Sequence, residues 1–227
     1  SDTKPEKKPD IRIVGSLKLN AVSAPVNKTF ADQLKAAAGS RPILLAASTH
    51  SPEEQILLKA SQEVVRAGYP HLLIIAPRHS DRSQDIARLV PKAAHRSKNQ
   101  LPLLGDNHFL ADSFGEMNSL VTAADIVFLG GSLVPKGGHN PLEIAALSTP
   151  LITGPSQFKN KIEFDTLQQY GQCITVKDGA TLVKQLTIWL EALRTDGRAI
   201  PQDNLDKACA YVKQACERPA KTAKLII

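Results

Sequence analysis

The feature that most constrains the fold is a series of short, uninterrupted apolar runs separated by amphipathic segments. The runs lie at residues 42–47 (PILLAA), 71–76 (HLLIIA), 125–129 (DIVFL), 151–153 (LIT) and 173–176 (CITV). Apolar runs without polar alternation are typical of strands that are buried on both faces of a parallel sheet. Helical patterns between these runs indicate βαβ units.

We therefore predict an α/β fold, a Rossmann-like parallel sheet of about six strands with helices on both faces. Two further short strands are predicted at residues 11–14 and 102–104. The predicted helices lie at residues 28–38, 52–67, 81–89, 115–124, 140–147, 158–170, 180–194 and 203–216. Ser51 is predicted to cap the helix at 52–67, with Glu53 and Glu54 in its first turn favouring the helix dipole.

Composition narrows the function only partly. The net charge of +6 leaves nucleic acid, an anionic membrane, phosphorylated small molecules or a merely solvated basic surface as explanations. An aromatic content of 4% argues against a protein that stacks nucleic-acid bases. The three cysteines form neither a disulfide framework nor a metal motif, which fits a reducing compartment. No apolar run is long enough to span a bilayer, and no signal-peptide pattern opens the chain.

Several common site motifs are missing from the sequence. There is no Gly-x-Gly-x-x-Gly after the first strand and no P-loop, which argues against a dinucleotide dehydrogenase and a P-loop NTPase. Neither His-Glu-x-x-His nor Cys-x-x-Cys occurs, so we expect no protein-held metal and no cofactor.

Small, hydroxyl-bearing or basic residues follow four of the predicted strands. They are Ser48-Thr49-His50, Arg78-His79, Gly130-Gly131-Ser132 and Gly154-Pro155-Ser156. Ligands of parallel α/β sheets bind beyond the carboxyl ends of the strands, so this regular placement predicts a ligand site there. Two rival interpretations stay open: the first segment could serve helix capping beside Ser51, and Arg78-His79 could be an ordinary surface pair.

The densest segment is GGSLVPKGGHNPLE at residues 130–143. Its paired glycines allow a tight turn and a close backbone approach, and exposed N–H groups beside a helix N-terminus form an anion site. Asn140 is a natural N-cap, and Glu143 follows at the spacing of a capping box. A plain capped helix start is the alternative interpretation.

These motifs resemble the Kdo transferases, which attach 3-deoxy-D-manno-oct-2-ulosonic acid (Kdo) to the lipid A precursor. The resemblance lies in GGSLVPKGGHNPLE, in ILLAASTH, IIAPRH and VGSLKLN, and in GEMNSLVTAADIVFLGG. It implies a GT-B enzyme, in which two Rossmann-like domains face a cleft. The polar composition of residues 1–10 predicts a linker. On the resemblance, residues 11–227 are the C-terminal domain that binds the donor, CMP-Kdo. The N-terminal domain, absent from this sequence, would bind the acceptor and carry the membrane segment and the catalytic base of an inverting transferase.

The resemblance also implies site residues. Glu143 would accept hydrogen bonds from the ribose hydroxyls, and Arg78 and His79 would hold the base or the anionic part of the donor. The remaining expected positions would line the phosphate, ribose and cytosine: Ser48, Thr49, Gly115, Glu116, Met117, Gly130, Gly131, Ser132, Gly138, His139 and Asn140. No catalytic residue is expected in this chain, and Ile144 and Ala145 stand where the family often has a proline.

The full protein is expected at the cytoplasmic face of the bacterial inner membrane, with peripheral contact or contact through its N-terminal segment. Nucleic acid is not an expected partner. Two alternatives remain: another GT-B sugar-nucleotide enzyme, such as a UDP-sugar transferase or an epimerase, or a non-catalytic nucleotide-binding domain.

Overall fold

The computed structural model describes residues 25–223, which form a single parallel sheet with helices on both faces. The seven strands run in the order β3-β4-β2-β1-β5-β6-β7, and all six pairings between neighbours are parallel. Their bounds are β1 Ile43–Thr49, β2 Leu72–Pro77, β3 Ala94–His95, β4 His108–Leu110, β5 Ile126–Leu129, β6 Leu151–Thr153 and β7 Cys173–Thr175. The predicted fold class is confirmed. The predicted linker, the strand at 11–14 and the VGSLKLN motif lie outside the described residues.

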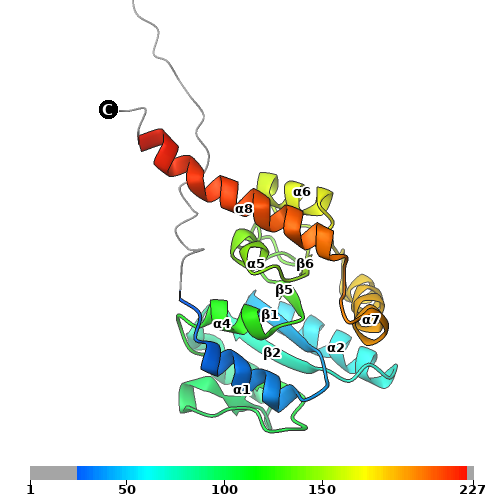
Figure 1. Cartoon of the computed structure of the whole chain (residues 1–227). Helices are drawn as coiled ribbons and strands as arrows, with labels where there is room; N and C mark the ends of the chain where they lie inside the picture. Colours follow the sequence, from blue (N-terminus) through cyan, green and yellow to red (C-terminus); the bar gives the residue numbers. More distant parts are fainter. Residues whose placement is uncertain (1–24, 224–227) are drawn as a thin grey trace, which may run out of the picture.

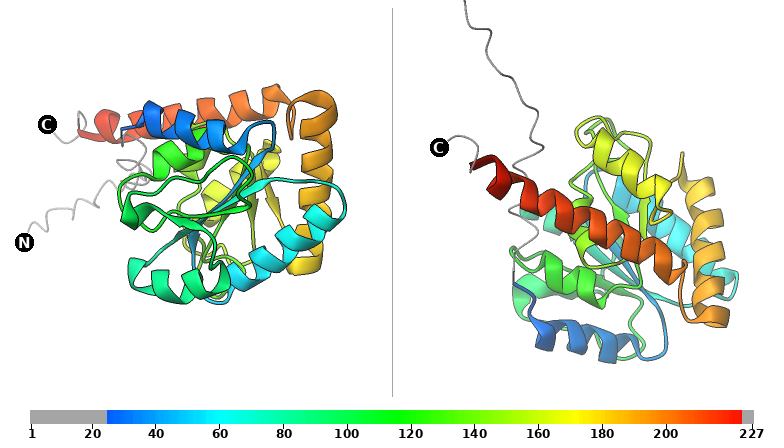
Figure 2. Two further views of the ribbon diagram at one scale, coloured as in Figure 1. Left: turned by 90° about the horizontal axis from the view of Figure 1, so that it is seen from below. Right: turned by 45° about the horizontal axis from the view of Figure 1, so that its top comes forward.

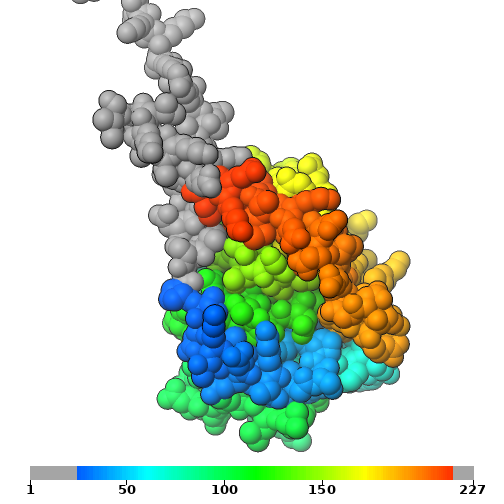
Figure 3. All heavy atoms as spheres, viewed as in Figure 1, coloured from blue at the N-terminus to red at the C-terminus, as the bar shows by residue number. Residues whose placement is uncertain are grey.

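The helices divide between the two faces of the sheet (Figures 1 and 2). Their bounds are α1 Lys28–Ala38, α2 Glu53–Arg66, η2 Ser80–Arg82, α3 Ser83–Leu89, η3 Arg96–Lys98, α4 Met117–Ala123, α5 Leu142–Ala146, α6 Lys161–Gln169, α7 Gly179–Asp196 and α8 Gln202–Ala223. Helices α1 and α8 lie on one side of the sheet, and α2 and α3 lie on the other (Figure 2, left). In the space-filling view, α1 and α8 share one surface, with atoms of α4 and α5 between them (Figure 3).

Each face of the sheet has its own hydrophobic core because successive strand residues point to opposite sides. Leu45 and Val127 pack toward Phe30 of α1 and Val121 of α4. The opposite face buries Leu44, Ile126 and Phe128 with side chains of α2 and α7, including Leu57 and Leu186. Both faces are therefore covered, which is why the strands could be apolar throughout.

Local signals fix the ends of several helices. Asn27 caps α1 by accepting the N–H of Phe30, and Gly39 ends that helix with a φ of 64°. Asp178 and Thr181 form a capping box at the start of α7. These termini follow from side chains near in sequence, so sequence patterns place them well.

Three local predictions are wrong: one strand, one helix cap and one helix start. Residues 102–104 are not a strand, because Leu103 and Leu104 are exposed and the sheet is extended by β3 and β4 instead. Ser51 does not cap α2, which begins at Glu53 without a side-chain cap. Helix α5 begins at Leu142 and not at 140, because the Asn140 side-chain oxygen accepts the N–H of Leu142 before the first helical turn. For Asn140 the reason is local, because its side chain accepts the N–H group two residues further on instead of capping a helix that starts at 140.

The strand order creates a switch point between β1 and β5. From β1 the sheet continues through β2 and β4 to β3 at one edge, and through β5 and β6 to β7 at the other. The connections that leave β1 and β5 therefore diverge to opposite faces and leave a crevice at the carboxyl ends of these strands. Ligands of open α/β sheets bind at this position.

Candidate functional site

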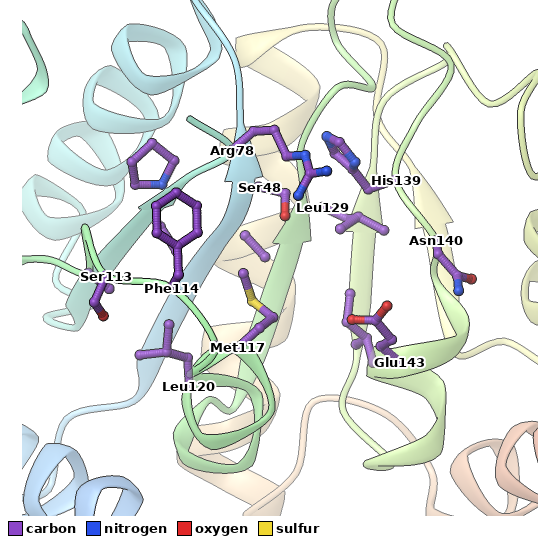
Figure 4. A pocket seen from close by; sticks show the side chains of 16 residues that line it. Ser48, Arg78, Ser113, Phe114, Met117, Leu120, Leu129, His139, Asn140 and Glu143 are labelled. Atoms are coloured by element: carbon purple, nitrogen blue, oxygen red, sulfur yellow. The ribbon is translucent and has the colours of Figure 1, made fainter. Parts of the chain in front are cut away.

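A cavity of about 330 Å³ opens at the switch point. Ser48 at the end of β1, Arg78 after β2, Leu129 at the end of β5 and Glu143 of α5 line it (Figure 4). The segment that leads into α4 forms another wall, with Ser113, Phe114, Gly115 and Met117. A mostly apolar cavity of this size with a few converging polar groups is typical of a small-ligand site.

Arg78 and Glu143 supply opposite charges to this cavity. Arg78 is exposed, and among the described residues no ion pair is recorded for it. Burial raises the pKa of the Glu143 carboxyl, and the nearby Arg78 guanidinium partly offsets that rise. A free guanidinium suits a phosphate, and a carboxylate suits a pair of hydroxyl donors.

The glycine-rich loop after β5 is already occupied by an internal anion. The carboxylate of Glu53 accepts the N–H groups of Gly131 (2.8 Å), Ser132 (3.0 Å) and Leu133 (2.9 Å), and also that of His50 (2.9 Å). The expectation that the N–H groups of Gly131 and Ser132 are exposed to an external anion is therefore wrong. Glu53 is fully buried, not on the solvent face of its helix.

Ser132, Gly130 and Thr49 support the walls of the site without lining the cavity. Ser132 is fully buried; its hydroxyl donates to the carbonyl of Leu129 and accepts the N–H of Gly154. A Cβ at Gly130 would lie 2.5 Å from the carbonyl oxygen of Ser48, so only glycine fits there. Thr49 is also fully buried. Gly130 thus permits the close approach of the ends of β1 and β5.

Three histidines gather beside the cavity. The Nε2 atoms of His50 and His139 lie 2.9 Å apart with the rings nearly coplanar, and the His79 ring is 5.6 Å from that of His50. Burial lowers the pKa of His139 to about 4, helped by the positive charges of neighbouring residues, and burial also lowers that of His50. His139 lines the cavity, whereas His50 does not.

Gly131 is held against this histidine pair. Its φ is 69°, and an added Cβ would lie 3.3 Å from the His139 ring and 3.4 Å from the His50 ring. A side chain there would be strained at this φ and would crowd the His139 ring. Gly131 therefore serves the packing of the pair, which is a different role from the one expected from the sequence.

The side chain of Glu116 points away from the cavity. It is held by two nitrogens of Arg96, the closer at 2.6 Å, and by the hydroxyl of Ser113. The Arg96 hydrogen bonds lower its pKa. Gly115 and Met117, on either side of Glu116, do line the cavity.

The structure thus brings together half of the residues expected from the sequence: Ser48, Arg78, Gly115, Met117, His139, Asn140 and Glu143. Thr49, His79, Glu116, Gly130, Gly131, Ser132 and Gly138 lie outside the lining. Sequence reasoning missed Glu53, Ser113 and Phe114. It placed His50 in the triplet after the first strand but gave it no role of its own, and no sequence signal distinguishes the buried Glu53 from an exposed first-turn acid.

Within residues 25–223, no cluster of His, Cys, Asp or Glu side chains has the geometry to hold a metal ion. Over the same residues, no helix combines the length and apolarity needed to cross a membrane.

Comparison with known sequences gives one consistent family. The chain is 46% identical over 123 residues to the 3-deoxy-D-manno-octulosonic acid transferase of Haemophilus influenzae, covering 52% of this chain and 29% of that protein. It is 32% identical over 181 residues to the corresponding transferase of Rickettsia felis, covering 78% of this chain and 39% of that protein. The chain thus spans well under half the length of these relatives. No protein-family model matches it.

Two solved structures superpose on most of this chain. The C-terminal CMP-Kdo binding domain of WaaA from Acinetobacter baumannii superposes with a TM-score of 0.68 at 28% identity, over 82% of this chain and 98% of that domain. A glycosyltransferase from Rickettsia africae superposes with a TM-score of 0.61 at 11% identity, over 93% of this chain and 55% of that chain, which shows a shared fold.

Proposed function

The chain belongs to the 3-deoxy-D-manno-octulosonic acid transferase family, and from this premise we propose that its cavity binds the nucleotide of CMP-Kdo. The chain would act as the donor domain of an inverting glycosyltransferase with GT-B architecture. Its acceptor would be the lipid A precursor, bound by a domain outside this chain. The whole protein would work at the cytoplasmic face of the inner membrane, attached through parts outside residues 25–223.

The observation that carries this proposal is the arrangement of Arg78 and Glu143 across one cavity at the switch point. Glu143 accepts the two ribose hydroxyls, because a carboxylate offers two acceptor oxygens to a diol. Arg78 pairs with the phosphate and stabilises the charge on the departing CMP. Gly115 and Met117 border the opposite wall, where the cytosine lies against Met117 and Phe114.

The geometry alters the donor-site assignment in one respect. Because Glu53 occupies the N–H groups of Gly131 and Ser132, phosphate binding falls to side chains, namely Arg78, Ser48 and His139. The role of the glycine-rich loop is to allow close packing, because its glycines let β1 and β5 approach each other and let the loop backbone approach the histidine rings.

Titration of the chain with CMP tests the proposal. We expect a dissociation constant in the high micromolar to millimolar range, roughly −4 to −6 kcal/mol, because the cavity is open on one side. UMP and UDP-sugars should bind more weakly, whereas a preference for them would favour the alternative of a UDP-sugar enzyme.

Glu143→Ala should weaken CMP binding by about 1.5–3 kcal/mol, since it removes hydrogen bonds to a charged acceptor. Glu63→Ala, which removes an exposed carboxylate from α2, is the matched control and should bind CMP like the parent. If Glu143→Ala lowers the melting temperature but leaves CMP affinity unchanged, Glu143 stabilises the first turn of α5 and does not bind the ribose. If the parent shows no response at several millimolar CMP, the proposed function fails.

A further inference from the structure

The contact between His50 and His139 imposes a limit on how many protons the two rings hold. Their Nε2 atoms are 2.9 Å apart, which is a hydrogen-bond distance. One Nε2 must then carry the proton and the other must present its lone pair. The pair can exist as two neutral rings, or as one imidazolium bonded to one neutral ring. Two imidazoliums would place two N–H groups against each other and break the contact.

The surroundings of the pair favour its neutral form. Burial is the largest effect and lowers the pKa of both rings. The charged and titratable groups that face the pair come from every neighbouring element: Arg78 and His79 after β2, Arg82 of η2, Lys136 of the glycine-rich loop, Lys159 before α6 and Glu53 of α2. All except Glu53 oppose a further positive charge.

The two rings have different access to a ligand. His139 and Arg78 both line the cavity, whereas His50 does not line it and donates its backbone N–H to the Glu53 carboxylate. Glu53 is the one facing group that favours a proton on His50. An anion in the cavity would offset the positive charges of Arg78, Lys136 and Lys159, and would thereby remove the main obstacle to charging the pair besides burial.

We propose that His50 and His139 act as one proton-binding unit, which takes up a single proton when the nucleotide phosphate enters the cavity. This inference rests on the proposed function, because the phosphate is that of the donor nucleotide. The proton comes from bulk solvent and stays on the pair, with one ring as imidazolium and the hydrogen bond between the Nε2 atoms kept. The site then gains one positive charge only while the ligand is bound. His50 is a positioning residue, since it acts through His139.

Calorimetry measures the proton directly. The heat of CMP binding is recorded in two buffers of different ionisation enthalpy, and the difference gives the number of protons exchanged. We expect net uptake with CMP and none with cytidine, which lacks the phosphate. The second pKa of a phosphate monoester is about 6, so the ligand itself can only release a proton on entering a cationic site, which is the opposite sign.

Variants assign the proton to the pair. The double variant His50→Gln/His139→Gln should abolish the uptake, because two amides can keep a hydrogen bond but neither can take up a proton. His50→Gln should leave CMP affinity within about tenfold of the parent. A tenfold change in affinity corresponds to a shift of one unit in the pKa of the pair on binding. His108→Gln, at a half-buried histidine on β4 outside the cavity lining, is the matched control and should keep the uptake.

Each outcome decides the inference. CMP binding without proton uptake in the parent, or uptake that persists in the double variant, overturns the histidine unit and leaves the proposed function intact. Absence of CMP binding in the parent overturns both. If a variant does not fold, nitrogen NMR of the parent imidazoles with and without CMP replaces it: His50 or His139 must gain a proton while His108 does not change.

Discussion

At the scale of single residues, the most informative side chain is Glu53. Its two carboxylate oxygens accept four backbone N–H groups from two segments that are about 80 residues apart in sequence. Nothing in the cavity can therefore use the N–H groups of Gly131 or Ser132. The carboxylate fixes the loop after β5 to the start of α2, and with it the histidine pair.

Glu53→Gln tests this role. The amide nitrogen would face N–H donors, and two charge-assisted hydrogen bonds would be lost at about 1.5 kcal/mol each, so the free energy of unfolding should fall by about 3 kcal/mol. Urea unfolding measures the change as a lower midpoint at constant slope. Glu63→Gln, on the exposed side of the same helix, should change stability by less than about 0.5 kcal/mol. Equal stability of the two variants would show that the Glu53 contacts contribute little.

At the scale of elements, an ion pair connects α2 to η2. Arg82 donates two hydrogen bonds to Glu54, at 2.7 and 3.0 Å, and Glu54 is almost fully buried. Burial raises the pKa of Glu54, but the hydrogen bonds and charge of Arg82, together with further hydrogen bonds to the carboxylate, outweigh burial and the pKa is lowered. Arg82 also contributes to the positive surroundings of His50. This connection between two elements holds the segment after β2 against α2, next to the site.

The lowered pKa of Glu54 predicts an acid-labile contribution to stability. The folded carboxyl has a pKa below its unfolded value of about 4.5, so its contribution is present above that pH and is lost as the pH falls toward the folded pKa. In Arg82→Ala the buried carboxylate loses its partner, and the protein should be destabilised by about 3–5 kcal/mol at neutral pH. The pKa of Glu54 should then rise. Acidification from neutral pH should therefore reduce the difference in unfolding free energy between variant and parent. Unfolding free energies measured across this pH range would contradict the prediction if the gap stayed constant.

At the scale of the whole molecule, the cavity lies open at the carboxyl edge of the sheet. Among the described residues that line it, Glu143 is the one carboxylate, and its proposed role is to bind the ribose. Attack on the sugar by an acceptor hydroxyl needs a general base within hydrogen-bond reach. We therefore propose that the base lies on a facing domain, outside the described residues.

The prediction at this scale is that the 227-residue chain, given CMP-Kdo and lipid A precursor, forms no product. A longer form that includes the acceptor domain should transfer Kdo, because it would supply the base and the second wall of the cleft. In that longer form, Arg78→Ala should lower kcat by roughly tenfold or more through lost stabilisation of the departing CMP. Mass spectrometry of the lipid product measures each rate. Efficient transfer by the chain alone would show that the base lies within it.

The sequence by itself determined the parallel sheet, most of its helices and the edge where ligands bind. These follow from local physics: uninterrupted apolar runs must be buried on both faces, and Asn27, Gly39 and Asp178 fix helix ends through contacts with near neighbours. The motif around residues 130–143 also pointed to the family.

Tertiary structure alone decided the inside of the site. Glu53 and Glu54 have the same local pattern as exposed first-turn acids, yet one accepts the loop N–H groups and the other pairs with Arg82. His50 and His139 are 89 residues apart, and only the packing of β1 against β5 brings their rings together. Long-range contacts of this kind depend on strand order, which no local pattern encodes.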